Sequence, residues 1–402
     1  MKICMIAWEF PPKICGGLGV HVYENSKKLV ENGNEVHVIT MKSEGLPSRE
    51  IMNGIDVLRI DYPDLRWIDR VLFPSDTQKL GMFEAFFTNT ISFNVFAFSA
   101  YKQLEKEGYE IDIVHAHDWL GIPAAMVLQK EFNIPFVLTM HSTEYGRSGG
   151  GGLSVIHNLE VLGGQKADRV ITVSNSMKEE LVSIGFEREK IDVVYNGVDE
   201  SKYNPRNSGV KIKEKFGIKG PLILFVGRLV WRKGVEYLIR AMPKIISIEP
   251  DAELIILGVG SEEEKLMKLA RDMRMENKIT FINRYVSEKE RIQFYAAADV
   301  VCVPSTYEPF GIVAVEGMSS GKPVVASRTG GLMEIINDGE SGLLANPGDA
   351  EDLANKITSI LKDKELAKKL SVGGRKRIEQ EFTWKKIAEK TLSIYEKVLY
   401  GL

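Results

Sequence analysis

Short apolar runs alternate with longer segments of helical periodicity through the first half of the chain. A helical pattern at residues 20–32 follows the first apolar run. The runs, each expected to be a buried strand, lie at residues 2–7, 35–40, 113–115, 136–139 and 170–173. Alternation of this kind is typical of βαβ units, whose strands form a parallel sheet. The first half is therefore expected to be a doubly wound α/β domain.

The same alternation restarts in the second half of the chain. Residues 222–226 are all apolar, as expected for a strand that is buried on both faces of a parallel sheet. Further runs follow at residues 253–257, 279–281, 300–303 and 323–326. Because ligands of open α/β sheets bind beyond the carboxyl ends of the strands, we expect two facing Rossmann-like domains with the substrate between them.

Turn-forming residues separate the two patterns. Asn-Gly, Asn-Pro and Ser-Gly pairs occur within residues 196–209, where apolar periodicity is lacking. The chain has 402 residues, more than a single core normally supports. We therefore divide it into a domain at residues 1–198, a linker at 199–209, a second domain at 210–382 and a terminal helix at 383–402 that packs across the domains.

The composition is that of an ordinary globular protein. Hydrophobic residues make up 44% and charged residues 27%, and the formal net charge is −3. The sequence therefore lacks the excess of positive charge that is typical of nucleic-acid-binding proteins. The three cysteines, Cys4, Cys15 and Cys302, are too few and too widely spaced for a disulfide framework or a Cys-x-x-Cys zinc site. This pattern favours a reducing compartment.

Neither the N-terminal apolar run nor the longest apolar stretch has the features of a secretion signal or a membrane span. The run Ile3 to Ala7 begins two residues after Met1 and lacks a basic n-region and a small-residue cleavage site. The most apolar long stretch, residues 83–101, contains polar side chains and predicts an amphipathic helix instead of a membrane span. We expect a cytoplasmic protein.

Two cations occupy a strand-to-helix connection in the second half. Arg228 follows the strand at 222–226, and Lys233 precedes a helical pattern at 235–242. A helix N-terminus favours an anion, and a departing nucleoside diphosphate needs stabilisation by a metal or by fixed cations. The sequence contains no Asp-x-Asp pair to hold such a metal. Arg228 and Lys233 are therefore the predicted charge clamp, with a solvated loop Arg and Lys as the alternative, and no cofactor or metal is expected.

Two glutamates occupy a second strand-to-helix connection. Glu308 lies in a Pro/Gly turn, and Glu316 follows within an apolar helical segment. Burial of a carboxylate is costly unless something donates hydrogen bonds to it, and ribose hydroxyls are such donors. Glu316 is thus a candidate ribose ligand, and a structural glutamate capped by backbone N–H groups is the alternative.

These motifs resemble those of the retaining GT-B glycosyltransferases of the GT4 type. The resemblance rests on the Glu-x7-Glu spacing of Glu308 and Glu316, on the preceding Gly-Arg and Lys-Gly pairs, and on the segments at 327–332 and 337–344. It covers essentially the whole chain, with residues 1–198 as the acceptor-side domain. Residues 210–382 would be the domain that binds the nucleotide sugar.

The resemblance also implies which residues surround the donor. It places Arg228 and Lys233 at the diphosphate, Glu316 at the ribose, and Glu308 with the backbone of Phe310 and Gly311 at the sugar. Gly330 and Gly331 would bring backbone N–H groups near phosphate or sugar, where side chains would obstruct.

A glycine-rich loop joins the first strand to its helix. The third glycine of a Gly-x-Gly-x-x-Gly fingerprint is missing, which argues against a dinucleotide site. The loop resembles the Lys-x-Gly-Gly-Leu motif of glycogen and starch synthases, which touches the donor, so Gly17 and Gly19 are assigned to donor binding. Ile14 occupies the position of the motif lysine and Lys13 is displaced by one, so the donor preference stays open.

Histidines mark two further strand ends. His115 and His117 form a poor zinc site because no third ligand is near in the sequence. The His-x-His-Asp-Trp sequence resembles that of the synthases and implies that Asp118 lies near the acceptor. His141 belongs to a Thr-x-His segment whose histidine, by the same resemblance, lies against the donor hexose, and a satisfied core histidine is the alternative. The glycines at 149–152 predict either a mobile loop over the acceptor channel or a plain surface loop.

The predicted activity is a retaining hexosyl transfer from a nucleotide-diphosphate sugar to an acceptor hydroxyl. The resemblance implies a metal-independent front-face displacement, in which the protein supplies charge and orientation. The motifs favour glucosyl transfer from ADP- or UDP-glucose to an α-glucan or glucose phosphate, as in glycogen synthases. The alternatives are a GT4 transferase with a lipid or small-molecule acceptor, a sugar-nucleotide epimerase and a non-catalytic nucleotide-sugar sensor.

Overall fold

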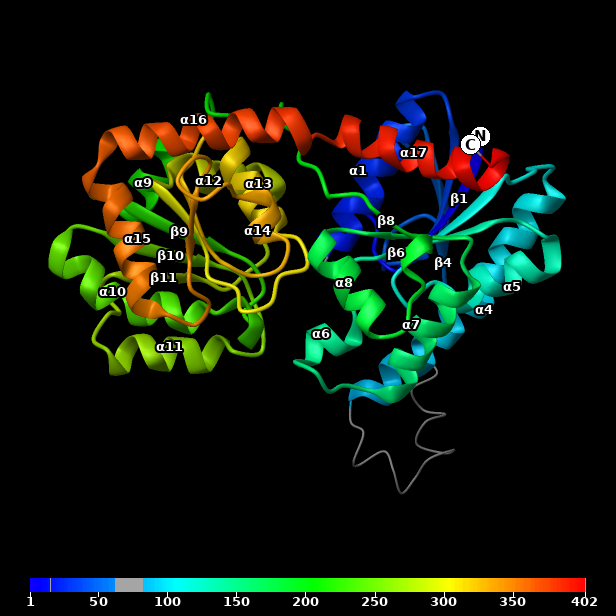
Figure 1. Ribbon diagram of the computed structural model, residues 1–402, viewed down its shortest axis with the longest axis horizontal. Helices are drawn as coiled ribbons and strands as arrows, with labels where there is room; N and C mark the ends of the chain where they lie inside the picture. Colours follow the sequence, from blue (N-terminus) through cyan, green and yellow to red (C-terminus); the bar gives the residue numbers. More distant parts are fainter. Residues whose placement is uncertain (15, 62–81, 402) are drawn as a thin grey trace, which may run out of the picture. The chain divides into compact units, whose positions relative to one another are not determined.

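The chain forms two compact units (Figure 1). The computed structural model describes residues 1–14, 16–61 and 82–401, without the side chains of residues 82–87, so Cys15 lies outside the described residues. Unit 1 comprises Met1–Val173, Lys178–Val194 and Ile387–Leu402, and unit 2 comprises Ser174–Met177 and Tyr195–Lys386. The boundaries between the units fall near the start of helix α8 (Asn175–Ser183), between Val194 and Tyr195, and near the start of helix α17 (Trp384–Tyr400).

Unit 1 contains an eight-stranded sheet in the order β3-β4-β2-β1-β5-β6-β7-β8. Its strands are β1 (Lys2–Ile6), β2 (Glu35–Met41), β3 (Arg49–Met52), β4 (Ile55–Ile60), β5 (Ile113–His117), β6 (Phe136–Met140), β7 (Arg169–Thr172) and β8 (Ile191–Val193). Neighbouring strands are parallel except for the pair β3 and β4. The strand order reverses between β1 and β5, so the loops that follow these two strands flank the crevice where such sheets bind ligands.

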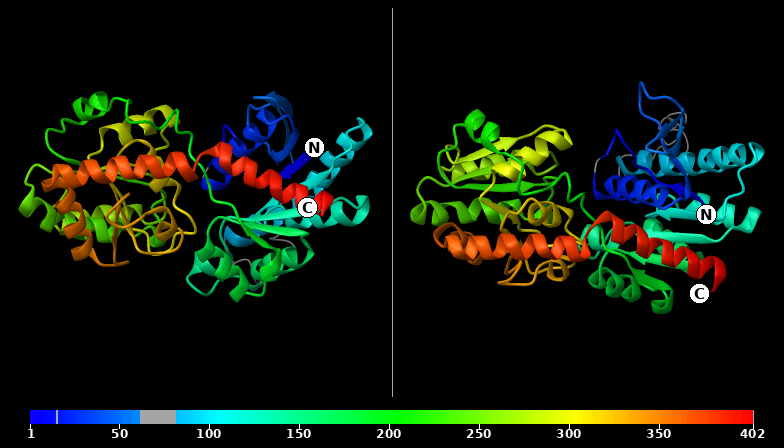
Figure 2. Two further views of the ribbon diagram at one scale, coloured as in Figure 1. Left: turned by 45° about the horizontal axis from the view of Figure 1, so that its top comes forward. Right: turned by 90° about the horizontal axis from the view of Figure 1, so that it is seen from above.

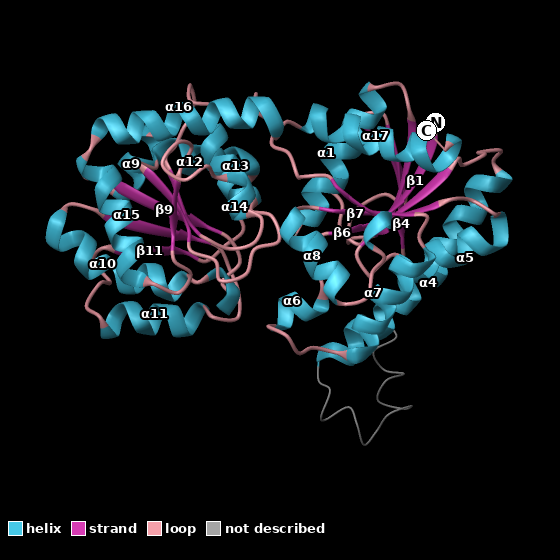
Figure 3. Cartoon of the chain, viewed as in Figure 1, coloured by secondary structure: helices cyan, strands magenta, loops and turns pink. Residues whose placement is uncertain are grey.

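The helices of unit 1 connect these strands and pack on the sheet (Figure 3). They are α1 (Gly17–Glu31), α4 (Met82–Lys106), α5 (Ile122–Phe132), α6 (Glu144–Ser148), α7 (Ser154–Lys166), most of α8 and most of α17. Helix α17 is held in unit 1 by Tyr395, whose hydroxyl contacts His115, and by Thr391, which accepts a hydrogen bond from Asn25. Strand β1 and the end of α17 therefore belong to the same unit, as Figure 2 shows from two sides.

Unit 2 contains a six-stranded sheet in the order β11-β10-β9-β12-β13-β14, with all neighbours parallel. Its strands are β9 (Leu222–Val226), β10 (Glu253–Leu257), β11 (Ile279–Ile282), β12 (Val300–Val303), β13 (Val324–Ser327) and β14 (Leu343–Ala345). Here the order reverses between β9 and β12. The loops after these two strands are consequently neighbours at the carboxyl edge of the sheet.

The helices of unit 2 cover this sheet and build its core. They are α9 (Val210–Phe216), α10 (Val235–Ile248), α11 (Glu263–Asp272), α12 (Glu288–Ala297), α13 (Ile312–Ser319), α14 (Leu332–Ile335), α15 (Ala350–Lys362) and α16 (Lys364–Glu381). Apolar side chains of α10 and α15, such as Leu238 and Ile357, are fully buried in one cluster with Ile223 and Leu254 of the sheet. The core rests on the apolar face of each helix and on strands that are buried on both sides.

The prediction of two Rossmann-like parallel sheets is confirmed. The hairpin of β3 and β4 was not predicted from the sequence, although Asn53 and Gly54 join the two strands with positive φ angles of 52° and 80°. An Asn-Gly pair between two strand-like runs is the usual signal for such a turn. The stretch at 83–101 is helical within α4, and none of the helices in the described ranges has the length and apolar character that a membrane crossing needs.

Candidate functional site

The loop after β9 in unit 2 comes very close to the loop after β12. Gly234 ends the short 3-10 turn Trp231–Lys233 with a φ of 63°, and it directly precedes α10. A Cβ atom at Gly234 would lie 2.0 Å from the carbonyl oxygen of Pro304. Glycine is therefore needed both for the left-handed backbone and for the close approach that places Lys233 beside the loop of Glu308.

Lys233 and Glu308 form an ion pair at this edge of the sheet. The Nζ atom of Lys233 lies 2.6 Å from Oε2 of Glu308, and the Ser305 hydroxyl donates to the same oxygen at 3.0 Å. Glu308 is 8% exposed. A short charge-assisted hydrogen bond of this kind fixes both side chains. The structure thus joins two residues that the sequence analysis assigned to different parts of the donor.

Arg228 lies in the same loop and is exposed. Its carbonyl oxygen accepts the N–H of Val230 at 3.0 Å, which holds the backbone of the loop. Within residues 1–14, 16–61 and 82–401, no side-chain hydrogen bond or ion pair involves the Arg228 guanidinium. Of the two cations predicted as a clamp, Lys233 has a carboxylate partner, and the Arg228 guanidinium is available to an anion.

Glu316 is buried on α13 and is held by donors from α12. The Tyr295 hydroxyl donates to its Oε2 at 2.6 Å, and the Arg291 guanidinium lies 3.3 Å from its Oε1. Arg291 also donates to the Tyr203 hydroxyl, at 3.0 Å from Nε and 2.8 Å from the NH2 group. In the part of the chain that the structure describes, the donors to this carboxylate are therefore side chains, in place of the backbone N–H groups of the structural alternative.

Burial and the Glu316 carboxylate determine the protonation states of Tyr295 and Arg291. Burial raises the pKa of Tyr295 well above its usual range, so its hydroxyl stays protonated and donates. The Glu316 carboxylate raises the pKa of Arg291, which therefore remains cationic. Each carboxylate oxygen has two acceptor positions, so Glu316 can accept further hydrogen bonds from ligand hydroxyls. Arg291 and Tyr295 were missed in the sequence, although their i, i+4 spacing places them on one helix face.

The two glycines after β13 pack against the loop of Glu308. Gly330 has a φ of 49°, and a Cβ there would lie 2.1 Å from the Glu308 carbonyl oxygen. The N–H of Gly331 donates to that same oxygen at 3.0 Å. The Gly331 N–H thus donates to a backbone carbonyl of the protein, whereas the resemblance implied a place near phosphate or sugar. Gly330 and Gly331 act through the backbone of the Glu308 loop.

Phe310 and Gly311 complete this loop. Phe310 is 3% exposed, and its ring stacks on Tyr195 with centroids 6.0 Å apart. Gly311 has a φ of 120°, and a Cβ there would lie 2.6 Å from a methyl carbon of Leu332. The buried ring anchors the loop, and the glycine allows the turn into α13.

In unit 1, the glycine-rich loop is held by Glu9. Its Oε2 accepts the N–H of Gly16 at 3.1 Å, just before α1. A Cβ at Gly19 would lie 3.0 Å from Glu9 Cβ and 3.1 Å from Ile14 Cγ1. The buried Gly19 therefore packs on residues of its own loop, whereas Gly17 is exposed. Ile14, at the position of the motif lysine, is part of that packing.

Asp118 holds the segment that carries His141. Its Oδ1 accepts the N–H of His141 at 2.7 Å, and its carboxylate also accepts the N–H of Ser142. Asp118 adopts a positive φ of 53°, which is uncommon for a residue other than glycine. Burial raises its pKa to about 6. The sequence analysis placed Asp118 at the acceptor and His141 at the donor, and the structure joins the two residues directly.

Behind this segment lies a second buried carboxylate. Glu160 of α7 is completely buried and accepts the N–H of Glu144 with both oxygens, at 2.9 and 3.1 Å. The Arg147 guanidinium lies 3.2 Å from Glu160 and 2.7 Å from the Ser142 hydroxyl. Burial raises the pKa of Glu160 to about 8. These contacts hold α6 against α7, so Glu160 and Arg147 position the backbone that follows His141.

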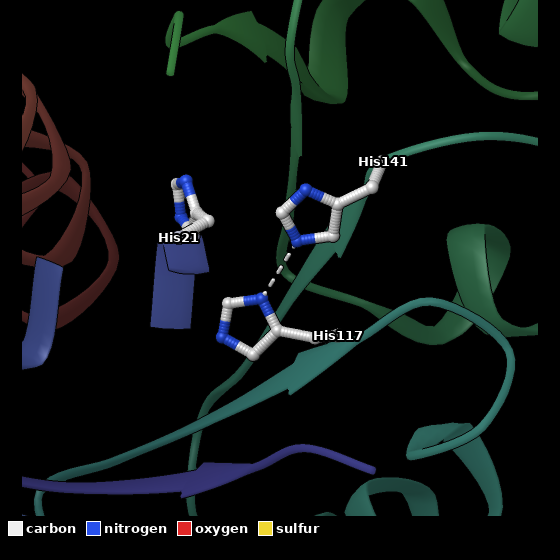
Figure 4. A group of neighbouring side chains, drawn as sticks. All are labelled: His21, His117 and His141. Atoms are coloured by element: carbon white, nitrogen blue, oxygen red, sulfur yellow. Dashed lines mark hydrogen bonds between the residues drawn. The ribbon is translucent and has the colours of Figure 1, made fainter. Parts of the chain in front are cut away.

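Three imidazoles meet beside this segment, as Figure 4 shows. Nδ1 of His117 lies 3.1 Å from Nε2 of His141, and the His21 ring packs edge-on against His141 with centroids 4.8 Å apart. Burial lowers the pKa of His117 well below its usual range and that of His141 to about 3, so both rings stay neutral. His115 is instead satisfied by Tyr395 and Thr139, at 2.5 and 2.6 Å.

The sequence does not show that His21 lies beside His117 and His141 in space. His115 and His117 lie two residues apart on β5, and no third ligand is near them in the sequence. The structure groups His117 with His21 of α1 and His141 after β6, because the ends of β5 and β6 are neighbours and α1 starts at the same edge. His115 does not belong to this group.

Both halves of the chain match known families of glycosyltransferases. The family described as "Glycosyl transferases group 1" matches residues 210–377, and "Glycosyltransferase Family 4" matches residues 15–202. The chain is 36% identical to an uncharacterized glycosyltransferase of Methanocaldococcus jannaschii, with 98% of each chain covered. It is 31% identical to a glycogen synthase of Mycobacterium tuberculosis, with 98% of this chain and 94% of that protein covered.

A solved structure extends the similarity to the whole fold. Sucrose-phosphate synthase from Thermosynechococcus elongatus superposes with a TM-score of 0.83 at 26% identity, over 100% of both chains. The matches cover both predicted halves and make the chain a hexosyltransferase, as its motifs implied. The chain therefore belongs to the GT4-type glycosyltransferases of the GT-B fold.

Proposed function

We propose that this enzyme transfers a glucosyl group from ADP- or UDP-glucose to the hydroxyl of an α-glucan, with retention of the anomeric configuration. The observation that carries the proposal is the arrangement in unit 2, where the Lys233–Glu308 pair shares one sheet edge with the exposed Arg228. A diphosphate would bind Arg228 and share Lys233 with Glu308, while the sugar lies against the Glu308 loop. The similarity to a glycogen synthase supports the choice of acceptor.

The proposed chemistry is a metal-independent front-face displacement. The departing phosphate oxygen accepts the proton of the acceptor hydroxyl, and Arg228 and Lys233 stabilise the charge that develops on the diphosphate. Glu316 would accept hydrogen bonds from the ribose with the acceptor positions that Tyr295 and Arg291 leave open. His141, held by Asp118, would contact the hexose. The buried free thiols of Cys4 and Cys302 support a cytoplasmic location for this reaction.

The test is release of nucleoside diphosphate from ADP-, UDP- and GDP-sugars, with and without glycogen and in the presence of EDTA. Glycogen-dependent release from a glucose donor, unaffected by EDTA, is the expected result, and NMR of the product should show an α-linkage. Release with a lipid or small-molecule acceptor alone would move the assignment to another GT4 activity. Conversion of a UDP-sugar without any acceptor would point to an epimerase, and loss of activity in EDTA would contradict the metal-independent mechanism.

A further inference from the structure

A cluster of three imidazoles in unit 1 has the composition of a transition-metal site. The described side chains His21, His117 and His141 each offer a ring nitrogen, and these nitrogens lie within 4.8 Å of one another. Imidazole is a common ligand of zinc and related ions, whereas calcium and magnesium take oxygen ligands. Three histidines with an open fourth position are a known zinc arrangement.

The distances support this interpretation. In a tetrahedral zinc site with bonds of about 2.0–2.1 Å, neighbouring ligand nitrogens are roughly 3.3 Å apart. Nδ1 of His117 and Nε2 of His141 are already 3.1 Å apart, so one edge of the tetrahedron is formed. The His21 ring lies beside the pair, as Figure 4 shows, and its ligand nitrogen is within 4.8 Å of the other two.

Burial and protonation also suit a metal. His21 and His117 are 1% and 0% exposed, and His141 is half-buried, so His141 contributes the solvent-accessible surface of the three side chains. A metal needs neutral imidazoles, and burial lowers the pKa of both His117 and His141. Nε2 of His117 is buried and has no hydrogen-bond partner among the described residues. That ring can carry its proton on Nε2 and offer the Nδ1 lone pair to a metal.

We propose that His21, His117 and His141 bind one zinc-type divalent ion and that this ion inhibits the transferase. The inhibitory part rests on the proposed function, because an ion bound to Nε2 of His141 removes that nitrogen from the donor hexose. Metal and donor therefore compete for His141. Structural zinc sites give each ligand an acceptor for its other ring nitrogen, and Nε2 of His117 has none in the described residues, so we expect weaker binding than in such sites.

Direct binding tests the site without reference to activity. Tag-free protein is titrated with Zn²⁺ by calorimetry, and one ion per chain is expected. His21→Ala should weaken the affinity at least ~10-fold, as loss of a ligand costs at least what loss of a supporting contact does. His157→Ala, which removes a half-buried histidine of α7 outside the cluster, is the matched control and should bind as the wild type does. Absence of binding, or equal binding by His21→Ala and wild type, overturns the proposal.

A second measurement uses the wild-type chain alone and so does not depend on the folding of a variant. Zn²⁺ should shift the NMR signals of His21, His117 and His141 most strongly and leave those of His37 and His157 in place, whereas His115, whose ring centroid is 4.3 Å from that of His117, should shift less. Shifts confined to other histidines would overturn the site. Zn²⁺ should also slow nucleoside diphosphate release, with recovery in EDTA. Binding at the three histidines without inhibition would uphold the site and remove His141 from the proposed donor contacts.

Discussion

The Nζ atom of Lys233 lies 2.6 Å from Oε2 of Glu308, in a strand-end loop where Arg228 is exposed. The two cations therefore differ in the ligand-free enzyme. Lys233 compensates a buried carboxylate, so it contributes both to stability and to the charge of the site. The Arg228 guanidinium lacks a recorded side-chain partner within the described ranges, so its contribution should appear only when an anion binds.

The first prediction separates these two roles by substitution. Arg228→Ala should lower kcat at least ~100-fold, as expected for loss of one fixed donor to a developing charge. Its free energy of unfolding should change by less than about 0.5 kcal/mol, because an exposed side chain is removed. Single-turnover kinetics and urea unfolding provide the two measurements.

Lys233→Ala should lower kcat by a similar factor and also destabilise the protein. Removal of the ammonium leaves Ser305 as the donor to the Glu308 carboxylate among the described residues, and loss of a charged partner from a buried carboxylate costs about 1–3 kcal/mol. Double substitution of Lys233 and Glu308 should recover part of that stability without recovering kcat. Full activity in either single variant would contradict the clamp.

Site residues in the loop that follows a strand could be predicted from the sequence, and residues brought in by helix packing could not. Arg228 and Glu308 follow short apolar runs within a βαβ alternation, a pattern that favours buried parallel strands, so their placement at one edge of a sheet could be predicted. The partners of Glu316 could not, because Tyr295 and Arg291 lie on a different helix whose packing angle is set by tertiary contacts. His21 was missed for the same reason, since helical periodicity identifies a buried face but not the residues that it meets.

The second prediction concerns the support of Glu316 by α12. Tyr295→Phe removes the hydroxyl that donates to Glu316 at 2.6 Å and leaves a carboxylate oxygen poorly satisfied. The KM for the donor should rise at least ~10-fold while kcat changes little, because a hydrogen bond to a charged group is worth about 1.5–3 kcal/mol and its loss frees the Glu316 carboxylate from the position that the ribose needs. Tyr400→Phe, at an exposed position, is the control and should leave KM unchanged. An unchanged KM in Tyr295→Phe would mean that Glu316 does not contact the donor.

The third prediction concerns the close packing of Gly330 on the Glu308 loop. Gly330→Ala would place a methyl group 2.1 Å from the Glu308 carbonyl oxygen. This distance is too short for two non-bonded atoms, so the loop must move. We expect at least a ~10-fold loss of kcat/KM, since a misplaced catalytic group can cost about 100-fold. Gly339→Ala is the matched control, because Gly339 also has a positive φ of 78° but no heavy atom would lie within 4 Å of its Cβ.

The control separates backbone strain from displacement of the loop. Gly339→Ala should lose about 1 kcal/mol of stability from its left-handed backbone and keep its kcat/KM. Equal activities in the two variants would show that the contact between Gly330 and Glu308 is not required. Thermal unfolding of both variants and steady-state rates at saturating acceptor give the comparison.

The last prediction uses the buried Glu160 as a source of pH-dependent stability. Its pKa is raised from 4.5 to about 8 because burial disfavours the carboxylate, despite the nearby Arg147 guanidinium. Between these two values the folded state holds a proton that the unfolded state releases. Its contribution to stability is therefore fully present below about pH 4.5 and is lost as pH rises through about 8.

Glu160→Gln removes this titration, because the amide stays neutral at every pH while it keeps one acceptor for the N–H of Glu144. The free energy of unfolding of the wild type, relative to that of the variant, should fall by at least ~1 kcal/mol between pH 5 and pH 8.5. Glu131→Gln, at an exposed position of α5, controls for the loss of one carboxylate and should follow the wild type. Urea unfolding at several pH values tests this, and parallel pH profiles for wild type and Glu160→Gln would show that Glu160 is ionised in the folded protein.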